Sequence, residues 1–99
     1  PHIIKKMIDQ IFDRGEPVTI GEIEFSKLGY SRMKTKFFGK GEKETVYWTD
    51  TVYIPKFDSG QVVLWKDKDG ESQVFSTIPM STANAVVIPE LVKACVNRA

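Results

Sequence analysis

Apolar positions at the two ends of this 99-residue chain repeat with the period of a helix. Near the start they lie three and four positions apart, and Gly15 follows them as a stop signal. These positions are Ile3, Ile4, Met7, Ile8, Ile11 and Phe12. Within 83–98 the same spacing recurs at Val87, Leu91, Val92 and Cys95. The pattern predicts one amphipathic helix at each end.

The start of the second helix has two alternatives because of Pro89. In the first, the helix begins near Asn84, with Asn84 or Thr82 as its N-cap, and kinks at the proline. In the second, a turn holds 84–88 and the regular helix begins at Pro89, where a missing N–H has no cost.

Between the helices, alternating apolar runs separated by Gly, Asp and Ser turns predict about six strands in up-and-down order. The runs are 17–25, 30–38, 45–50, 51–57, 61–66 and 71–79. A break in the alternation at Gly21-Glu22 is typical of a bulge, and Pro55 marks an edge or a bend. Asp67-Lys68-Asp69-Gly70 is typical of a tight hairpin turn. We therefore expect a curved antiparallel sheet with the last helix across its open end.

Composition narrows the class of protein. The chain is 41% hydrophobic and 27% charged, which fits one globular domain over 1–99. Its 14 basic and 13 acidic residues give a net charge of +1, so we expect no nucleic-acid partner. A single cysteine excludes an internal disulfide and a multi-cysteine metal site. No apolar run approaches the roughly 18 to 20 residues of a membrane span. Because the sequence begins Pro1-His2, we expect it to be excised from a longer chain, with either a membrane anchor or a further domain upstream.

The order of these features resembles a bacterial pleckstrin-homology-like domain, and more narrowly the cytoplasmic domains that follow membrane spans in some bacterial membrane proteins. The resemblance rests on a leading helix ending near Gly15 and on the stretches 23–30, 46–50, 59–64 and 84–88. It implies an α+β, mainly β fold: a curved antiparallel sheet or partly open barrel of roughly six to seven strands, with an N-terminal helix and a C-terminal capping helix. It also implies binding or scaffolding on the cytoplasmic side of a membrane, without an established ligand.

Basic residues are concentrated in one stretch that contains no acid. They are Lys27, Arg32, Lys34, Lys36 and Lys40. On a strand, Arg32, Lys34 and Lys36 share one face, and several cations on one face can hold the phosphate oxygens of an anionic lipid headgroup. The alternative is a solvated strand face on which lysines prevent edge pairing.

Aromatic residues recur on successive predicted strands, and alternation prevents all of them from pointing inward. Tyr47, Tyr53 and Trp65 are the candidates for a half-exposed patch that contacts a peptide or another protein partner. The alternative is packing within the core and across strands.

Catalytic and metal-binding chemistry finds little support in the sequence. His2 is the only histidine and lies beside the terminus, and Cys95 lies on the apolar stripe of a helix. Asp50, Asp58 and Asp67 fall at strand ends or turns, where Asp bonds the local backbone. The loop after 67 lacks the late bidentate carboxylate of a calcium loop.

We expect no enzyme, cofactor or metal. The first hypothesis is a non-catalytic module that binds a protein; an anionic membrane surface and a small enzyme are the alternatives.

Overall fold

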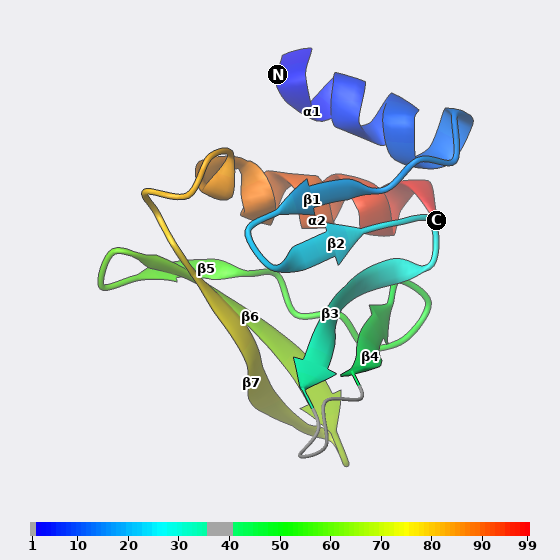
Figure 1. Cartoon of the computed structure of the whole chain (residues 1–99). Coiled ribbons are helices and arrows are strands. Elements are labelled where there is room, and N and C mark those ends of the chain that lie inside the picture. The colour runs from blue at the N-terminus through cyan, green and yellow to red at the C-terminus, as the bar shows by residue number, and fades with distance from the viewer. Residues whose placement is uncertain (1, 36–40) are drawn as a thin grey trace.

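The computed structural model describes residues 2–35 and 41–99, and it is helical at both ends and β in between (Figure 1). Helix α1 spans His2–Ile8 and continues into a π-helical turn, η1, at Asp9–Asp13. A 3₁₀ turn, η2, at Ala85–Val87 leads into helix α2, Ile88–Arg98. The strands are β1 (Val18–Ile20), β2 (Ile23–Phe25), β3 (Gly29–Thr35), β4 (Gly41–Tyr47), β5 (Lys56–Asp58), β6 (Gln61–Lys68) and β7 (Glu71–Pro79). The expected α+β, mainly β class is confirmed.

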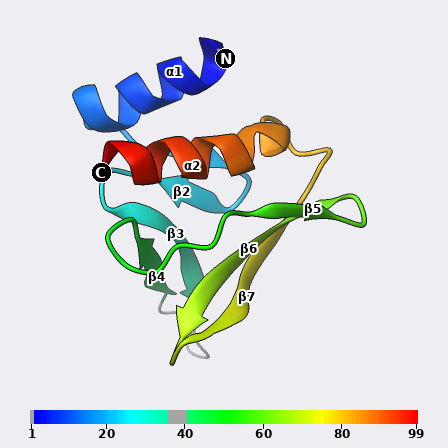
Figure 2. The same ribbon diagram turned by 180° about the vertical axis from the view of Figure 1, so that it is seen from behind.

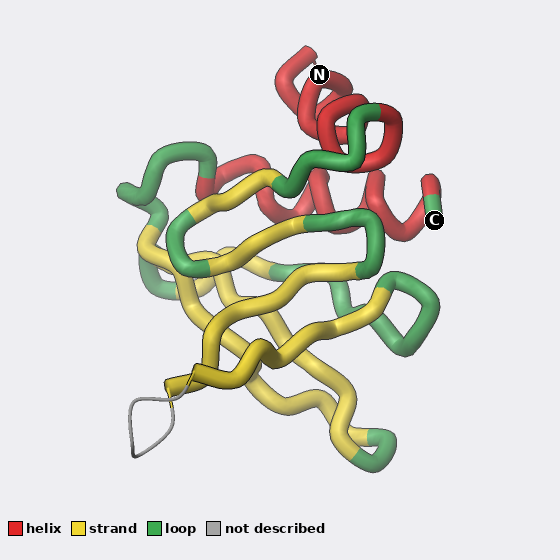
Figure 3. Tube along the Cα trace, turned by 45° about the vertical axis from the view of Figure 1, so that its right-hand side comes forward, coloured by secondary structure: helices red, strands yellow, loops and turns green. Residues whose placement is uncertain are grey.

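The strands form two antiparallel sheets, one of four strands in the order β1-β2-β3-β4 and one of three in the order β5-β6-β7. Each strand pairs with its neighbours in sequence, so the predicted up-and-down order is confirmed. Among the described residues no strand pairing joins the two sheets, and they do not close into a barrel (Figure 3).

The expected bulge at Gly21-Glu22 is wrong, because these two residues form a hairpin turn. Ile20 pairs directly with Ile23, and Gly21 has the positive φ of +60° that such a turn requires. The buried side chains come from Val18, Ile20, Ile23 and Phe25. A two-residue turn keeps these four side chains on one face of the hairpin. The break in the alternation at Gly21-Glu22 is therefore the turn itself, and the same four residues stay buried. The one expected strand is therefore two, which makes seven described strands.

Two other hairpins have two-residue turns with positive φ at both positions, at Ser59-Gly60 and at the predicted site, Asp69-Gly70. The register irregularity of the second sheet lies between Leu64 and Trp65. The expected strand at 51–57 is mostly wrong. Residues 51–55 form no ladder, and β5 begins after Pro55, which supplies no backbone N–H.

The second alternative for the last helix is the one observed, with a turn before a regular helix. Asn84 adopts a left-handed conformation with φ +68° and makes no side-chain capping bond, so it is not the N-cap of α2. Val87 occupies that position, and Pro89 lies in the first turn. Pro89 fits there because the first N–H groups of a helix have no partner within it.

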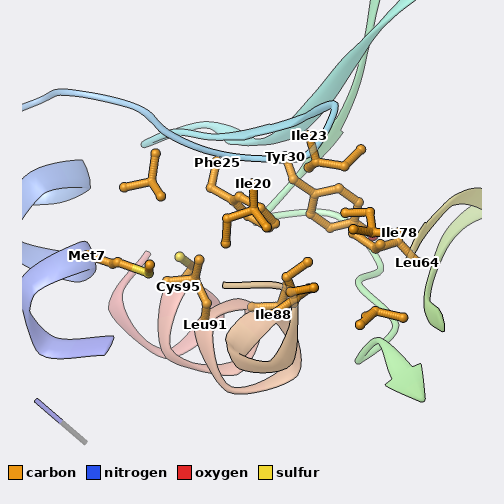
Figure 4. Close-up of a cluster of buried hydrophobic side chains, with 14 of the residues drawn as sticks. Met7, Ile20, Ile23, Phe25, Tyr30, Leu64, Ile78, Ile88, Leu91 and Cys95 are labelled. Atoms are coloured by element: carbon orange, nitrogen blue, oxygen red, sulfur yellow. The ribbon is translucent and has the colours of Figure 1, made fainter. Parts of the chain in front are cut away.

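The buried apolar side chains form one core between the sheets and α2 (Figure 4). Ile88, Leu91, Val92 and Cys95 of α2 are completely buried, so the predicted stripe faces the core, while Val87 is only partly covered. Helix α2 lies across one end of the sheets, with α1 on its outer side (Figures 1 and 2). Arg98 of α2 bonds Asp13, with 2.6 Å between Nη2 and Oδ1, and its guanidinium lies over the ring of Phe12.

Tyr30 links the two sheets. Its ring contacts Trp48 and Phe75, with centroids 5.6 and 5.4 Å away. Its hydroxyl donates to the carbonyl oxygen of Trp65 on β6 at 2.5 Å. Burial raises the pKa of Tyr30, so the hydroxyl keeps its proton and remains a donor.

Candidate functional site

The predicted basic stripe is only partly within the described residues. Lys27 is exposed in the connection between β2 and β3. Arg32 and Lys34 lie on β3. Lys36 and Lys40 lie outside the described residues. The stripe as a whole therefore stays a prediction, because the structure describes only Lys27, Arg32 and the backbone of Lys34.

Acidic residues of β4 lie opposite the basic residues of β3. The ladder pairs Arg32 with Glu44 and Lys34 with Glu42. Arg32 Nη2 is 3.8 Å from Glu44 Oε1, and its guanidinium carbon lies 5.1 Å from the ring centroid of Phe75. Opposite charges directly across a ladder attract each other, so the positive charge of Arg32 is partly balanced within the fold.

Lys66 of β6 also binds Glu44, so Arg32, Glu44 and Lys66 form a charged cluster between the two sheets. Arg32 and Lys66 each lie two residues beyond a core residue, Tyr30 and Leu64, on strands that run away from α2 (Figure 1). The three side chains are between a fifth and a third exposed. The cluster therefore lies at the border between core and solvent, where an ion pair is only moderately screened.

Tyr53 and Trp65, two of the three predicted contact residues, do lie together. With Val52, Ile54, Lys56 and Ser72 they line an open hollow of about 500 Å³, which we call the aromatic hollow. The Tyr53 hydroxyl donates to Asp67 Oδ1 at 3.0 Å. This bond to a carboxylate raises the pKa of Tyr53 above its ordinary value of 10.0. Val74, opposite Trp65 in the ladder, is 55% exposed.

Tyr47, the third predicted contact residue, lies at the end of β4 and is 46% exposed. It lines a different hollow of about 750 Å³, which we call the edge groove. The edge groove is bounded by 44–47 of β4, by 49–51, and by 66–68 of β6. Asp67 lines this groove and also holds Tyr53, so the two hollows adjoin.

Sequence reasoning missed most of the edge groove, including Thr45, Asp50 and Lys68. These three residues belong to no sequence motif that indicates a binding site. The available signal was indirect: the break at Thr49-Asp50 and Pro55 show that the chain leaves β4 without forming a long next strand.

Of the residues considered for catalysis, Cys95 lies in the core, Asp58 bonds its neighbour, and Asp50 and Asp67 line the edge groove. Cys95 is buried among apolar side chains, and burial raises the pKa of its thiol from 9.0 to about 12. Asp58 accepts a hydrogen bond from the neighbouring Ser59, and Asp67 accepts one from Tyr53. Over 2–35 and 41–99 no group of three or more His, Cys, Asp and Glu residues could hold a metal ion.

Comparisons with protein-family models, with curated proteins and with solved structures found no match to this chain. In the part of the chain that the structure describes, no helix combines the length and the apolar character needed to cross a membrane.

Proposed function

We propose that this chain is a non-catalytic protein-binding module with a pleckstrin-homology-like architecture. A four-stranded and then a three-stranded antiparallel meander, followed by a helix across one end, supports this proposal, because these are the parts expected from the resemblance. The resemblance also favours a place in a longer chain at the cytoplasmic face of a membrane.

The aromatic hollow is the observation that carries the protein-binding proposal. Tyr and Trp are enriched in protein interfaces, where their large rings bury much area and lose few rotamers. Here Tyr53 and Trp65 are half-buried, so the fold already holds them in place. Lys56 and Ser72 give the hollow a polar rim, and exposed Val74 lies opposite Trp65 in the ladder. A preformed aromatic centre with a polar rim is the usual composition of a protein contact surface.

The anionic-surface alternative has less support, because Arg32 contacts Glu44 and Phe75 and does not extend into solvent as a free cation. Phosphate binding by Arg32 requires breaking the contact with Glu44. A protein partner at the aromatic hollow requires no such rearrangement.

Site-specific photocrosslinking in cells that express the full-length protein tests the proposal. A photoreactive amino acid replaces Val74, which lies beside Trp65, or Lys93, which is exposed on α2 and serves as the control. We expect a discrete protein adduct from position 74 and none from position 93. Substitution Trp65→Ala should reduce the adduct at position 74. Adducts to lipid alone, or the same adducts from both positions, would contradict the proposal.

A further inference from the structure

Two strand edges border the edge groove, and no described strand pairs with either of them there. Among the residues that the structure describes, strand β4 pairs only with β3, on one side. Strand β6 pairs with β5 only over 61–63, so its edge from 64 to 68 is open on that side among the residues that the structure describes. Both edges line the same hollow, through 44–47 and 66–68. An open edge offers unpaired N–H and C=O groups to another strand.

Backbone hydrogen bonds at the end of β4 show which of its backbone groups point into the groove. Trp48 N–H donates to the carbonyl oxygen of Leu28 at 3.0 Å, so Trp48 faces the β3 side. In an antiparallel ladder residues two apart face the same side, so Val46 and Glu44 also bond towards β3. The N–H and C=O of Thr45, and the N–H of Tyr47, therefore point away from β3. The carbonyl oxygen of Tyr47 is used by the N–H of Asp50.

On β6 the same reasoning applies from Trp65. Its carbonyl oxygen accepts the Tyr30 hydroxyl from the other sheet, so the backbone of Trp65 faces away from β7. Asp67, two residues further, shares that direction. The edge groove thus has backbone donors and acceptors on both walls, and Tyr47 is among the residues that line it.

We propose that the edge groove binds an extended segment of a partner protein, which adds to β4 as a further strand; this rests on the protein-binding function proposed above. An extended backbone is the occupant whose N–H and C=O groups match, in spacing, the N–H and C=O of Thr45 and the N–H of Tyr47. At about 3.3 Å per residue, the wall formed by 44–47 accommodates about four or five residues. The side chain opposite Tyr47 contributes selectivity, and we expect it to be aromatic or β-branched.

One substitution tests the backbone N–H of Thr45 separately from its side chain. Thr45→Pro removes the outward N–H without removing a ladder bond to β3, and proline is tolerated on such an edge. Thr45→Ala removes the side chain and keeps the N–H. Thr19→Pro is the matched control on the opposite edge of the same sheet: Ile20 and Ile23 close a two-residue turn, so Thr19 of β1 also points its N–H outward.

The experiment selects displayed linear peptides on the wild-type protein and measures their affinity for the three variants. We expect the selected peptides to bind Thr45→Ala and Thr19→Pro almost as well as wild type, and to bind Thr45→Pro about tenfold more weakly or worse. Equal affinity for Thr45→Pro and wild type would overturn the proposal. Failure to select any linear peptide would also overturn the proposal. A wild-type dimer that Thr45→Pro dissociates would overturn it as well, because the occupant of the groove would then be a second copy of the chain.

A second measurement uses only the wild-type protein, so it does not require the Thr45→Pro variant to fold. Amide exchange of the wild-type protein is followed with and without a selected peptide. Slower exchange at Thr45, with no change at Thr19, is the expected result, and unchanged exchange at Thr45 would overturn the proposal. The crosslink from position 74 tests the protein-binding function separately, because it does not depend on how the edge groove is filled.

Discussion

The α2 end of the core and the side between β4 and β6 differ in what covers the sheets. At the α2 end, Ile88, Leu91, Val92 and Cys95 are completely buried against apolar side chains. On the β4–β6 side, the sheets are linked by the Tyr30 hydroxyl and by the charged cluster of Arg32, Glu44 and Lys66. The first region excludes water, whereas the second is partly exposed and has open strand edges. We infer that stability depends mainly on the first region and binding on the second.

The largest expected effect is at the α2 end. Leu91→Ala should lower the free energy of unfolding by about 3 kcal/mol, because it removes a completely buried side chain and leaves a cavity. Chemical denaturation measures the change. Lys93→Ala, on the exposed face of the same helix, is the control and should change the value by less than about 0.5 kcal/mol. A loss below about 1 kcal/mol for Leu91→Ala would contradict the role given to α2.

A smaller effect is expected where the sheets are linked. Tyr30→Phe should lower the free energy of unfolding by about 1 to 2 kcal/mol, because the ring remains and only the bond to the Trp65 carbonyl oxygen is lost. Denaturation of this variant is compared with that of Tyr47→Phe, whose side chain is half-exposed and should have no measurable effect. If the two variants were equally stable, the hydroxyl of Tyr30 would not contribute to joining the sheets.

Alkaline pH should weaken the α2 end. The pKa of Cys95 rises from 9.0 to about 12 on folding, so above pH 9 the unfolded chain loses this proton while the folded chain retains it. Stability from this group is present in full below pH 9 and is lost progressively as the pH rises towards 12. Burial raises the pKa of Tyr30 and acts in the same direction. Unfolding curves at pH 8 and pH 10 for the wild type and Cys95→Ala measure the effect, and an equal loss in both proteins would contradict the assignment to Cys95.

The smallest expected effect on stability concerns the charged cluster. Arg32→Met should cost about 1 kcal/mol or less, because the ion pair with Glu44 is partly exposed and the contact with the Phe75 ring is modest. Part of this cost should disappear at high salt, which screens the ion pair. Denaturation at low and high salt is the measurement. A loss as large as that of Leu91→Ala would show that the cluster stabilises the fold as strongly as α2 does.

Local signals explain why much of the fold could be predicted. The stripe of α2, the positive-φ turn at Asp69-Gly70 and the stop at Gly15 depend on residues close together in sequence. The β1–β2 hairpin was missed because a bulge and a two-residue turn interrupt the alternation in the same way. Only the pairing of Ile20 with Ile23 distinguishes them.

The candidate site was less predictable, because it depends on pairing between distant residues. Nothing in the sequence near Arg32 indicates that Glu44 lies opposite it or that Lys66 joins the pair from another sheet. Exposed aromatic residues could be predicted from the alternation, and Tyr53 and Trp65 line the same hollow. Their separation from Tyr47 follows from the path of 49–55, which forms no ladder and carries no periodic pattern.

Amide exchange of the free protein is the most direct test of the difference between the two regions. The exchange rates of Thr45 and Val46 are compared, since they are neighbours on β4 with opposite backbone directions, and Leu91 serves as the reference for the α2 end. The account predicts slow exchange at Val46 and Leu91 and fast exchange at Thr45, because the N–H of Thr45 faces the edge groove. Slow exchange at Thr45, equal to that at Val46, would show that the β4 edge is already paired and would contradict the account.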